Sequence, residues 1–133
     1  MHAFFAPQLK IPKGTTDISF YEKGLNAKEI FRFCNDDGSV HVAEFELGEG
    51  IFHVHEIMSD AFHSPLHTNS TSVIIGLFVE DVPAVIAQAV LAGATIISPS
   101  TDYDYGYRQG EFQDPFGHRW QIQKKIAIVD KME

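Results

Sequence analysis

The sequence predicts an α+β fold made of two βαβββ modules related by pseudo-twofold symmetry, with curved mixed sheets and the helices on their convex side. Three observations predict it. The chain has 133 residues, 44% hydrophobic and 21% charged, which suits one domain or two fused half-domains. Aligned with itself at an offset of 67, it gives six identities within 24 positions without a gap, where composition alone gives about one or two. Each copy also contains one helical and four extended segments.

The six identities define the repeat. They are Ala27 with Ala94, Ile30 with Ile97, Asp37 with Asp104, Glu44 with Glu111, Phe45 with Phe112 and Gly50 with Gly117. Two copies are too few for a solenoid, so we expect the halves to pack as a pair. The first module spans residues 1–57, a linker 58–71, the second module 72–124, and a mobile or docked tail 125–133.

The first copy begins with an expected strand from Phe4 to Ile11. Thr15 or Thr16 caps a helix that buries one apolar face, and Asn26 ends it because asparagine tolerates the left-handed conformation. Strands then follow over residues 29–34, 40–47 and 51–57, separated by polar or glycine-containing turns at 35–38 and 48–50.

The second copy begins with the β-branched run 73–79, which predicts a strand buried on both faces. Asp81 caps a helix with Pro83 in its first turn, and Gly93 ends it. Shorter strands follow near 95–98, 107–113 and 119–124. The turn from Asp114 to His118 has an Asp, a Pro and a Gly where a tight turn needs them, so we interpret it as structural.

Composition excludes several classes of function. The net charge is −8 and Lys and Arg form no stripe, which argues against nucleic acid. The longest apolar runs are too short for a bilayer, and the N-terminal residues lack a secretory signal, so we expect a cytoplasmic protein without a membrane segment. The single cysteine, Cys34, lies between apolar neighbours and is expected to be buried and structural.

Several motifs occur in order along the repeat: Phe20-Tyr21, Glu80 to Val82, Ala92 to Ala94, Tyr105 to Gly110 and Asp114 to Trp120. With these motifs, residues 3 to 124 resemble the vicinal oxygen chelate superfamily of glyoxalases, bleomycin-resistance proteins and extradiol dioxygenases. Within it the chain looks most like the PhnB-like branch. The resemblance implies a ligand cavity on each concave sheet, or one cavity shared across a dimer.

In metal-dependent members of that superfamily, four side chains from the first and last strands of the modules bind a divalent ion. The matching positions here are Ala6, Val54, Ile74 and Gln121, of which only Gln121 can coordinate a metal. A slip of two residues replaces Val54 by Glu56 and still gives too few ligands. We therefore expect no metal cofactor, and a site for Zn, Ni, Mn or Fe stays the alternative.

Histidines offer a second possible metal site. His53 and His55 share one face of a strand at a spacing that suits metal ligands. No third ligand is identifiable, so we favour packing beneath a helix or contact with solvent as the explanation for the pair. His63 and His67 lie in the linker, as part of a lid or as solvated loop residues.

Arg108 follows Tyr105 and precedes Gly110, a combination that can place a cation and aromatic faces at the mouth of a pocket for an anionic or polar aromatic ligand. The alternative is an ion pair between Arg108 and a nearby carboxylate. Trp120 and Phe112 are expected in the core.

Two functions follow from these observations. The first is binding of a small molecule in a concave pocket without the usual metal, with Gln121, Arg108, Glu56, His55 and Tyr105 as ligand-binding residues. The alternative is a metal-dependent lyase, isomerase or dioxygenase with an irregular metal site. A purely structural dimerising module is a third interpretation, and the sequence does not decide whether any reaction is catalysed.

The open sheet edges of each module predict a homodimer.

Overall fold

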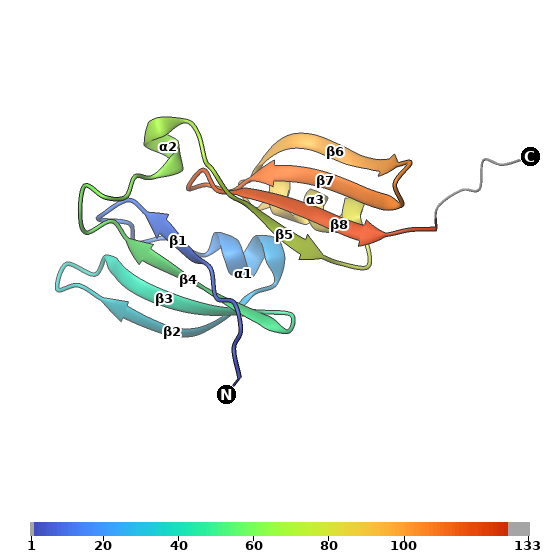
Figure 1. Ribbon diagram of the computed structural model, residues 1–133. Coiled ribbons are helices and arrows are strands. Elements are labelled where there is room, and N and C mark those ends of the chain that lie inside the picture. Colours follow the sequence, from blue (N-terminus) through green and yellow to red (C-terminus); the bar gives the residue numbers. More distant parts are fainter. Residues whose placement is uncertain (1, 128–133) are drawn as a thin grey trace, which may run out of the picture.

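The computed structural model describes residues 2–127 and contains two four-stranded sheets with helices on one side (Figure 1). The first module consists of β1 (Gln8–Ile11), α1 (Phe20–Leu25), β2 (Lys28–Cys34), β3 (Val40–Leu47) and β4 (Gly50–Glu56). The second consists of β5 (Ile74–Phe78), α3 (Val82–Leu91), β6 (Thr95–Tyr103), β7 (Tyr107–Gln113) and β8 (Arg119–Lys125). A short helix, α2 (Pro65–Thr68), lies in the linker. The predicted α+β fold of two βαβββ modules is confirmed.

Both sheets have the same topology. Their strand orders are β1-β4-β3-β2 and β5-β8-β7-β6, the first pair in each is parallel, and the other pairs are antiparallel. The repeated residues occupy matching places, because Phe45 and Phe112 are both completely buried and Ala27 and Ala94 both lie in the core. The repeat in the sequence therefore corresponds to a repeat in the structure.

The turns between the last two strands of each module differ in length, and this changes the register of the repeat. Phe45 in β3 pairs with Phe52 in β4, whereas its counterpart Phe112 in β7 pairs with Trp120 in β8. The offset is 67 residues from β3 to β7 but 68 from β4 to β8. The β7–β8 turn contains the extra residue, so the structural counterpart of Gln121 is His53.

One hydrophobic core joins the modules. Helices α1 and α3 pack against each other, and aromatic side chains from both modules meet beside them. Tyr21 of α1 donates a hydrogen bond to Asp114 Oδ2 at 2.7 Å, and Trp120 Nε1 donates to the same oxygen at 3.0 Å. Asp114 also accepts from the backbone N–H groups of Phe116 and His118. The turn motif therefore fixes one module against the other, which its sequence did not indicate.

This buried contact predicts a loss of stability in alkali. Burial, together with the Asp114 carboxylate, raises the pKa of Tyr21 well above its ordinary value of 10.0. The folded state holds the phenolic proton more tightly, so the stabilisation is complete below pH 10 and falls as pH rises through that value. We expect an extra slope of about 1.4 kcal/mol per pH unit in urea unfolding, absent in Tyr21→Phe. Identical pH profiles for the two proteins would contradict this reading.

Helix ends confirm part of the sequence prediction. Asn26 adopts φ 58° after α1 and Gly93 adopts φ 122° after α3, while the Asp81 side chain caps α3 by accepting from Ala84 N. The first helix begins later than predicted, with Ser19 at its N-cap, because Thr15 Oγ1 instead donates to Pro12 O at 2.7 Å.

Several strand predictions are wrong in their bounds or burial. The first strand begins at Gln8, and Phe4 and Phe5 are 75% and 95% exposed. Pro7, directly before this strand, has no backbone N–H to donate to a neighbouring strand. β6 continues to Tyr103, beyond its predicted end. β5 is not buried on both faces, since Ile74 and Phe78 are exposed and the residues between them alternate.

Cys34 is exposed, contrary to the prediction that it is buried. It ends β2, which is an edge strand, so its apolar neighbours Phe31 and Phe33 also keep about half their surface in solvent, at 48% and 58%. Among the helices of residues 2–127, none is long and apolar enough to cross a bilayer. Residues 128–133 of the predicted tail lie outside the described part.

Candidate functional site

The second module presents a polar and aromatic surface on the side of its sheet opposite α3. Strand alternation places Phe112 and Trp120 on the inner side, against the helices, and the intervening residues on the outer side, which we call the second open face. In Figure 1, α3 lies behind β7 and β8, so this face points toward the viewer. Its side chains in β7 and β8 are Tyr107, Gln109, Glu111, Gln113, Arg119, Gln121, Gln123 and Lys125.

A chain of three side chains crosses this face. Tyr105 Oη donates a hydrogen bond to Gln109 Oε1, and Gln109 Nε2 donates to Gln123 Oε1 at 2.9 Å. The Gln123 amide then lies across β5, where a Cβ on Gly76 would sit only 2.8 Å from Gln123 Nε2. Gly76 therefore allows the amide to approach the strand closely, and the relay directs the Gln123 N–H groups toward the middle of the face.

Aromatic rings form one end of the second open face. Tyr103 stacks on Tyr105 with ring centroids 5.3 Å apart, and Tyr105 and Tyr107 are 5.7 Å apart. Phe78 of β5 lies 6.2 Å from Tyr107 and is 57% exposed. We call these four rings the aromatic rim. Such exposed rings offer stacking surfaces for a planar ligand.

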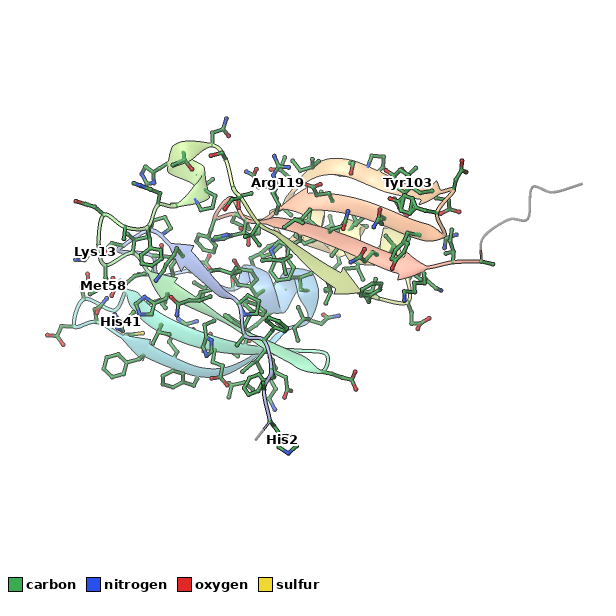
Figure 2. All side chains as sticks on the ribbon, viewed as in Figure 1. His2, Lys13, His41, Met58, Tyr103 and Arg119 are labelled. Atoms are coloured by element: carbon green, nitrogen blue, oxygen red, sulfur yellow. The ribbon has the colours of Figure 1, made fainter. Side chains whose placement is uncertain are left out.

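The opposite end of the face is charged. Arg119 pairs with Glu111 at 2.6 Å and also donates to the Gln113 side chain. Figure 2 shows Tyr103 and Arg119 at opposite ends of this sheet. Gln121 lies between them, opposite Glu111 in β7 and Gly76 in β5. The structure thus places the predicted residues Gln121 and Tyr105 on one face.

Arg108, in β7, points to the side of the sheet opposite the second open face. Gly110, two residues along, is so close to α3 that an added Cβ would lie 2.3 Å from Ile86 Cδ1, which assigns this side of β7 to the helix. Arg108 makes two hydrogen bonds to Asp102, at 2.7 and 3.2 Å. This pair raises the pKa of Arg108 and lowers the pKa of Asp102. The structure therefore does not bring Arg108 together with Gln121.

Histidines of β4 occupy the corresponding surface of the first module, which we call the first open face. His53 Nε2 lies 3.1 Å from Glu44 Oε1, and His55 Nδ1 donates to the backbone oxygen of Glu56 at 2.7 Å. Val54, the position assigned to the second metal ligand, is completely buried on the helix side. The prediction was wrong by one residue, because the repeat offset along the last strand is 68 rather than 67. His53 is the residue that matches Gln121.

Glu56 points into the protein and not onto the open face with His55. It is 1% exposed, and its Oε2 accepts from His41 Nδ1 at 2.6 Å and from Asn35 Nδ2 at 3.0 Å. The hydrogen bond from His41 lowers the pKa of Glu56. Its other oxygen, Oε1, has no hydrogen-bond partner. His41 and His55 rings are 4.7 Å apart, so Glu56 contributes to the first open face only through His41.

The positions implied for a metal supply few ligands. Ala6 and Ile74 have no donor atom, which leaves His53 and Gln121 on different sheets. Within residues 2–127, no three His, Cys, Asp or Glu side chains are grouped to hold a metal ion. The linker histidines His63 and His67 lie at α2, and His63 lines a cleft together with Gln8 and Lys10 of β1.

Gln109 and Gln123 were not predicted as site residues. Their signal in the sequence is the alternation of amides along two neighbouring strands, at 109 and 113 and at 121 and 123. Alternation alone indicates a solvated sheet face, and only the strand register shows that the amides join Tyr105.

Most of the chain matches one known protein family. Residues 16–122 match the model of the Glyoxalase/Bleomycin resistance protein/Dioxygenase superfamily. The chain belongs to this superfamily. Uncharacterised proteins are similar to this chain over nearly its whole length: a protein of Mycobacterium bovis is 31% identical over 132 residues, covering 96% of this chain and 87% of its own. A Mycobacterium tuberculosis protein is also 31% identical, with 96% and 78% covered.

Solved structures share the superfamily fold. TioX from Micromonospora is 19% identical with a TM-score of 0.68, over 92% of this chain and 100% of its own. A gene product from Arabidopsis thaliana is 23% identical with a TM-score of 0.70, over 92% and 98%. The fosfomycin resistance protein FosX from Mesorhizobium loti is 12% identical with a TM-score of 0.63, over 96% and 95%. At these identities the likeness concerns the fold alone.

Proposed function

We propose that this superfamily member, of the PhnB-like branch, binds a small aromatic molecule on its second open face without a metal ion. The observation that carries the proposal is the relay from Tyr105 through Gln109 to Gln123, which ends on amide N–H groups over Gly76. Binding through rings and amides needs no metal, and the superfamily's matching strand positions supply only His53 and Gln121 as donors.

The chemistry of the face defines the ligand. The aromatic rim offers stacking to a planar ring, with Phe78 and Tyr105 each more than half exposed, at 57% and 56%. Gln123 has both amide N–H groups beyond the relay, so it selects a hydrogen-bond acceptor such as a carboxylate or carbonyl. Gln121, next along the same side of β8, provides a second amide. A planar ring with one acceptor group satisfies both ends.

The experiment is titration of ¹⁵N-labelled protein with 2-naphthoate, followed by NMR. We expect shifts at Tyr105, Gln109 and Gln123, and a dissociation constant raised about fivefold to a hundredfold by Gln123→Leu or Gln121→Ala, since each removes a polar contact worth about 1 to 3 kcal/mol. Cyclohexanecarboxylate keeps the charge and lacks the flat ring, so it should bind more weakly.

Arg108→Gln is the matched control, because Arg108 lies in the same sheet on the opposite face. It should leave the affinity for 2-naphthoate unchanged. Equal weakening by Arg108→Gln and Gln123→Leu, or equal affinity for the two carboxylates, would place the ligand elsewhere. Metal-dependent chemistry at His53 and Gln121 is the alternative, and the metal measurement that closes the Discussion tests it.

We also propose that the protein forms a homodimer. β2 is an edge strand that pairs only with β3 in its sheet, and its Ile30, Phe31 and Phe33 are 46%, 48% and 58% exposed. Burying such side chains favours association. Light scattering at micromolar concentration should give twice the chain mass, and Phe33→Glu should reduce it to one chain. A wild-type monomer at that concentration would contradict the proposal.

A further inference from the structure

We propose a second binding site, for a small organic oxyanion such as a phosphate ester or carboxylate, in the cleft between β1, the linker and β5. The cleft has a volume of about 740 Å³ and lies where the two modules meet. None of the side chains of the second open face that make up the relay lines it. The site is therefore separate from the proposed aromatic site and stands independently of it.

The charge of the cleft is opposite to that of the protein. The chain carries 18 Asp and Glu residues against 10 Lys and Arg, with a net charge of −8. The residues that line this cleft nevertheless include no Asp or Glu, and they include Lys10, His63 and His118. A cleft free of carboxylates in so acidic a protein favours an anion, because bound anions there meet no like charge at close range.

Lys10 is the centre of the site. Its ammonium donates to the neutral Gln8 Oε1 at 2.7 Å and lies 4.3 Å from the centre of the Phe62 ring. Among the ion pairs of residues 2–127, none involves Lys10. An ammonium has three N–H donors, and the amide and the ring account for two. The third is left for a ligand, and the Phe62 contact holds the charge at the cleft.

Neighbouring groups add donors and position the strand. His118 Nε2 donates to the backbone oxygen of Lys10 at 2.8 Å, which joins the β7–β8 turn to β1. Ser70 of the linker and Ser72, which precedes β5, contribute hydroxyl groups that can donate to an anionic oxygen. An oxyanion near Lys10 would thus meet a cation and hydroxyl donors together.

The remaining lining defines the rest of the ligand. Leu9, Val73 and Ile75 give the cleft apolar walls, and a volume of about 740 Å³ accommodates more than an inorganic ion. We therefore expect an anionic head bonded at Lys10 and an uncharged body against these walls. Phosphate and carboxylate head groups are both oxyanions, and the test distinguishes between them.

The test is NMR titration of the ¹⁵N-labelled full chain with phenyl phosphate, benzoate and phenol. Phenyl phosphate or benzoate should shift the amides of Lys10, Phe62, Ser72 and His118, and phenol, which has the ring without the charge, should not. The stronger of the two anions identifies the head group. Lys10→Gln should weaken its binding about tenfold, and Lys10→Arg should retain it.

Lys13→Gln is the matched control, since Lys13 lies three residues further along and does not line this cleft. It should leave the dissociation constant unchanged. The proposal is overturned by equal weakening in Lys13→Gln, by equal shifts with phenol, or by no shift at about 10 mM of either anion. Shifts confined to Tyr105, Gln109 and Gln123 also overturn it, and they would support the aromatic site instead.

Discussion

Asp114→Ala should lower the free energy of unfolding by about 3 to 5 kcal/mol. The Asp114 side chain is 2% exposed and accepts from Tyr21 Oη, Trp120 Nε1 and two backbone N–H groups. Its removal leaves the buried Tyr21 and Trp120 donors without a partner, and each unsatisfied buried donor costs about 1 to 3 kcal/mol. Urea unfolding followed by Trp120 fluorescence measures the change.

Asp37→Ala is the control for this prediction. Asp37 accepts from Ser39 N and Ser39 Oγ in the turn between β2 and β3 of the first module, and it lies at the surface. Its loss should lower the free energy of unfolding far less than the loss of Asp114, because water replaces the lost partner. Equal effects of the two substitutions would show that the turn itself, and not the contact between modules, provides the stability.

Gly76→Ala should abolish most binding of 2-naphthoate while leaving the fold intact. The added Cβ would lie 2.8 Å from Gln123 Nε2, the end of a flexible side chain. Apart from its two chain neighbours, no other described residue comes within 4 Å of it. The amide must move, so its donors leave the middle of the second open face. We expect the dissociation constant to rise more than about tenfold and the stability to change by less than about 1 kcal/mol.

Gly110→Ala is the comparison in the same sheet. Its Cβ would meet Ile86 Cδ1 at 2.3 Å and the backbone of Ser100 and Pro99 at 3.1 and 3.3 Å. The backbone cannot move aside as an amide can, so this variant should lose about 1 to 3 kcal/mol of stability. Unchanged 2-naphthoate affinity in Gly76→Ala, with the fold intact, would contradict the role given to Gln123.

The fold was predictable because its signals are local and repeated. Asp81 and Gly93 bound one helix, Asn26 ends the other, and the two copies support each other's interpretation. Long-range effects were not predictable. Asp114 appeared to serve only its own turn, and its contact with Tyr21 joins residues 93 positions apart.

The candidate site was predictable only in part, because a single residue in a turn changes a strand's register. Counting with one offset selected Val54, which is buried, in place of His53. Side-chain direction also depends on register, so Arg108 and Gln121 appeared to share a pocket although they lie on opposite faces of one sheet. In the sequence, the alternating amides at Gln109 and Gln123 indicate no function. Their role becomes visible only when the structure places Tyr105 beside them.

The central claim is that the protein binds its ligand without a metal, and metal analysis of the purified protein tests it most directly. Protein dialysed with and without chelator should contain well below one ion per chain, and Zn²⁺, Ni²⁺, Mn²⁺ or Fe²⁺ should change Tm by less than about 1 °C. The opposite result is close to one ion per chain, with a Tm that falls by several degrees on chelation and recovers with one of these ions. Loss of that recovery in His53→Ala or Gln121→Ala would then establish a metal centre and contradict the account.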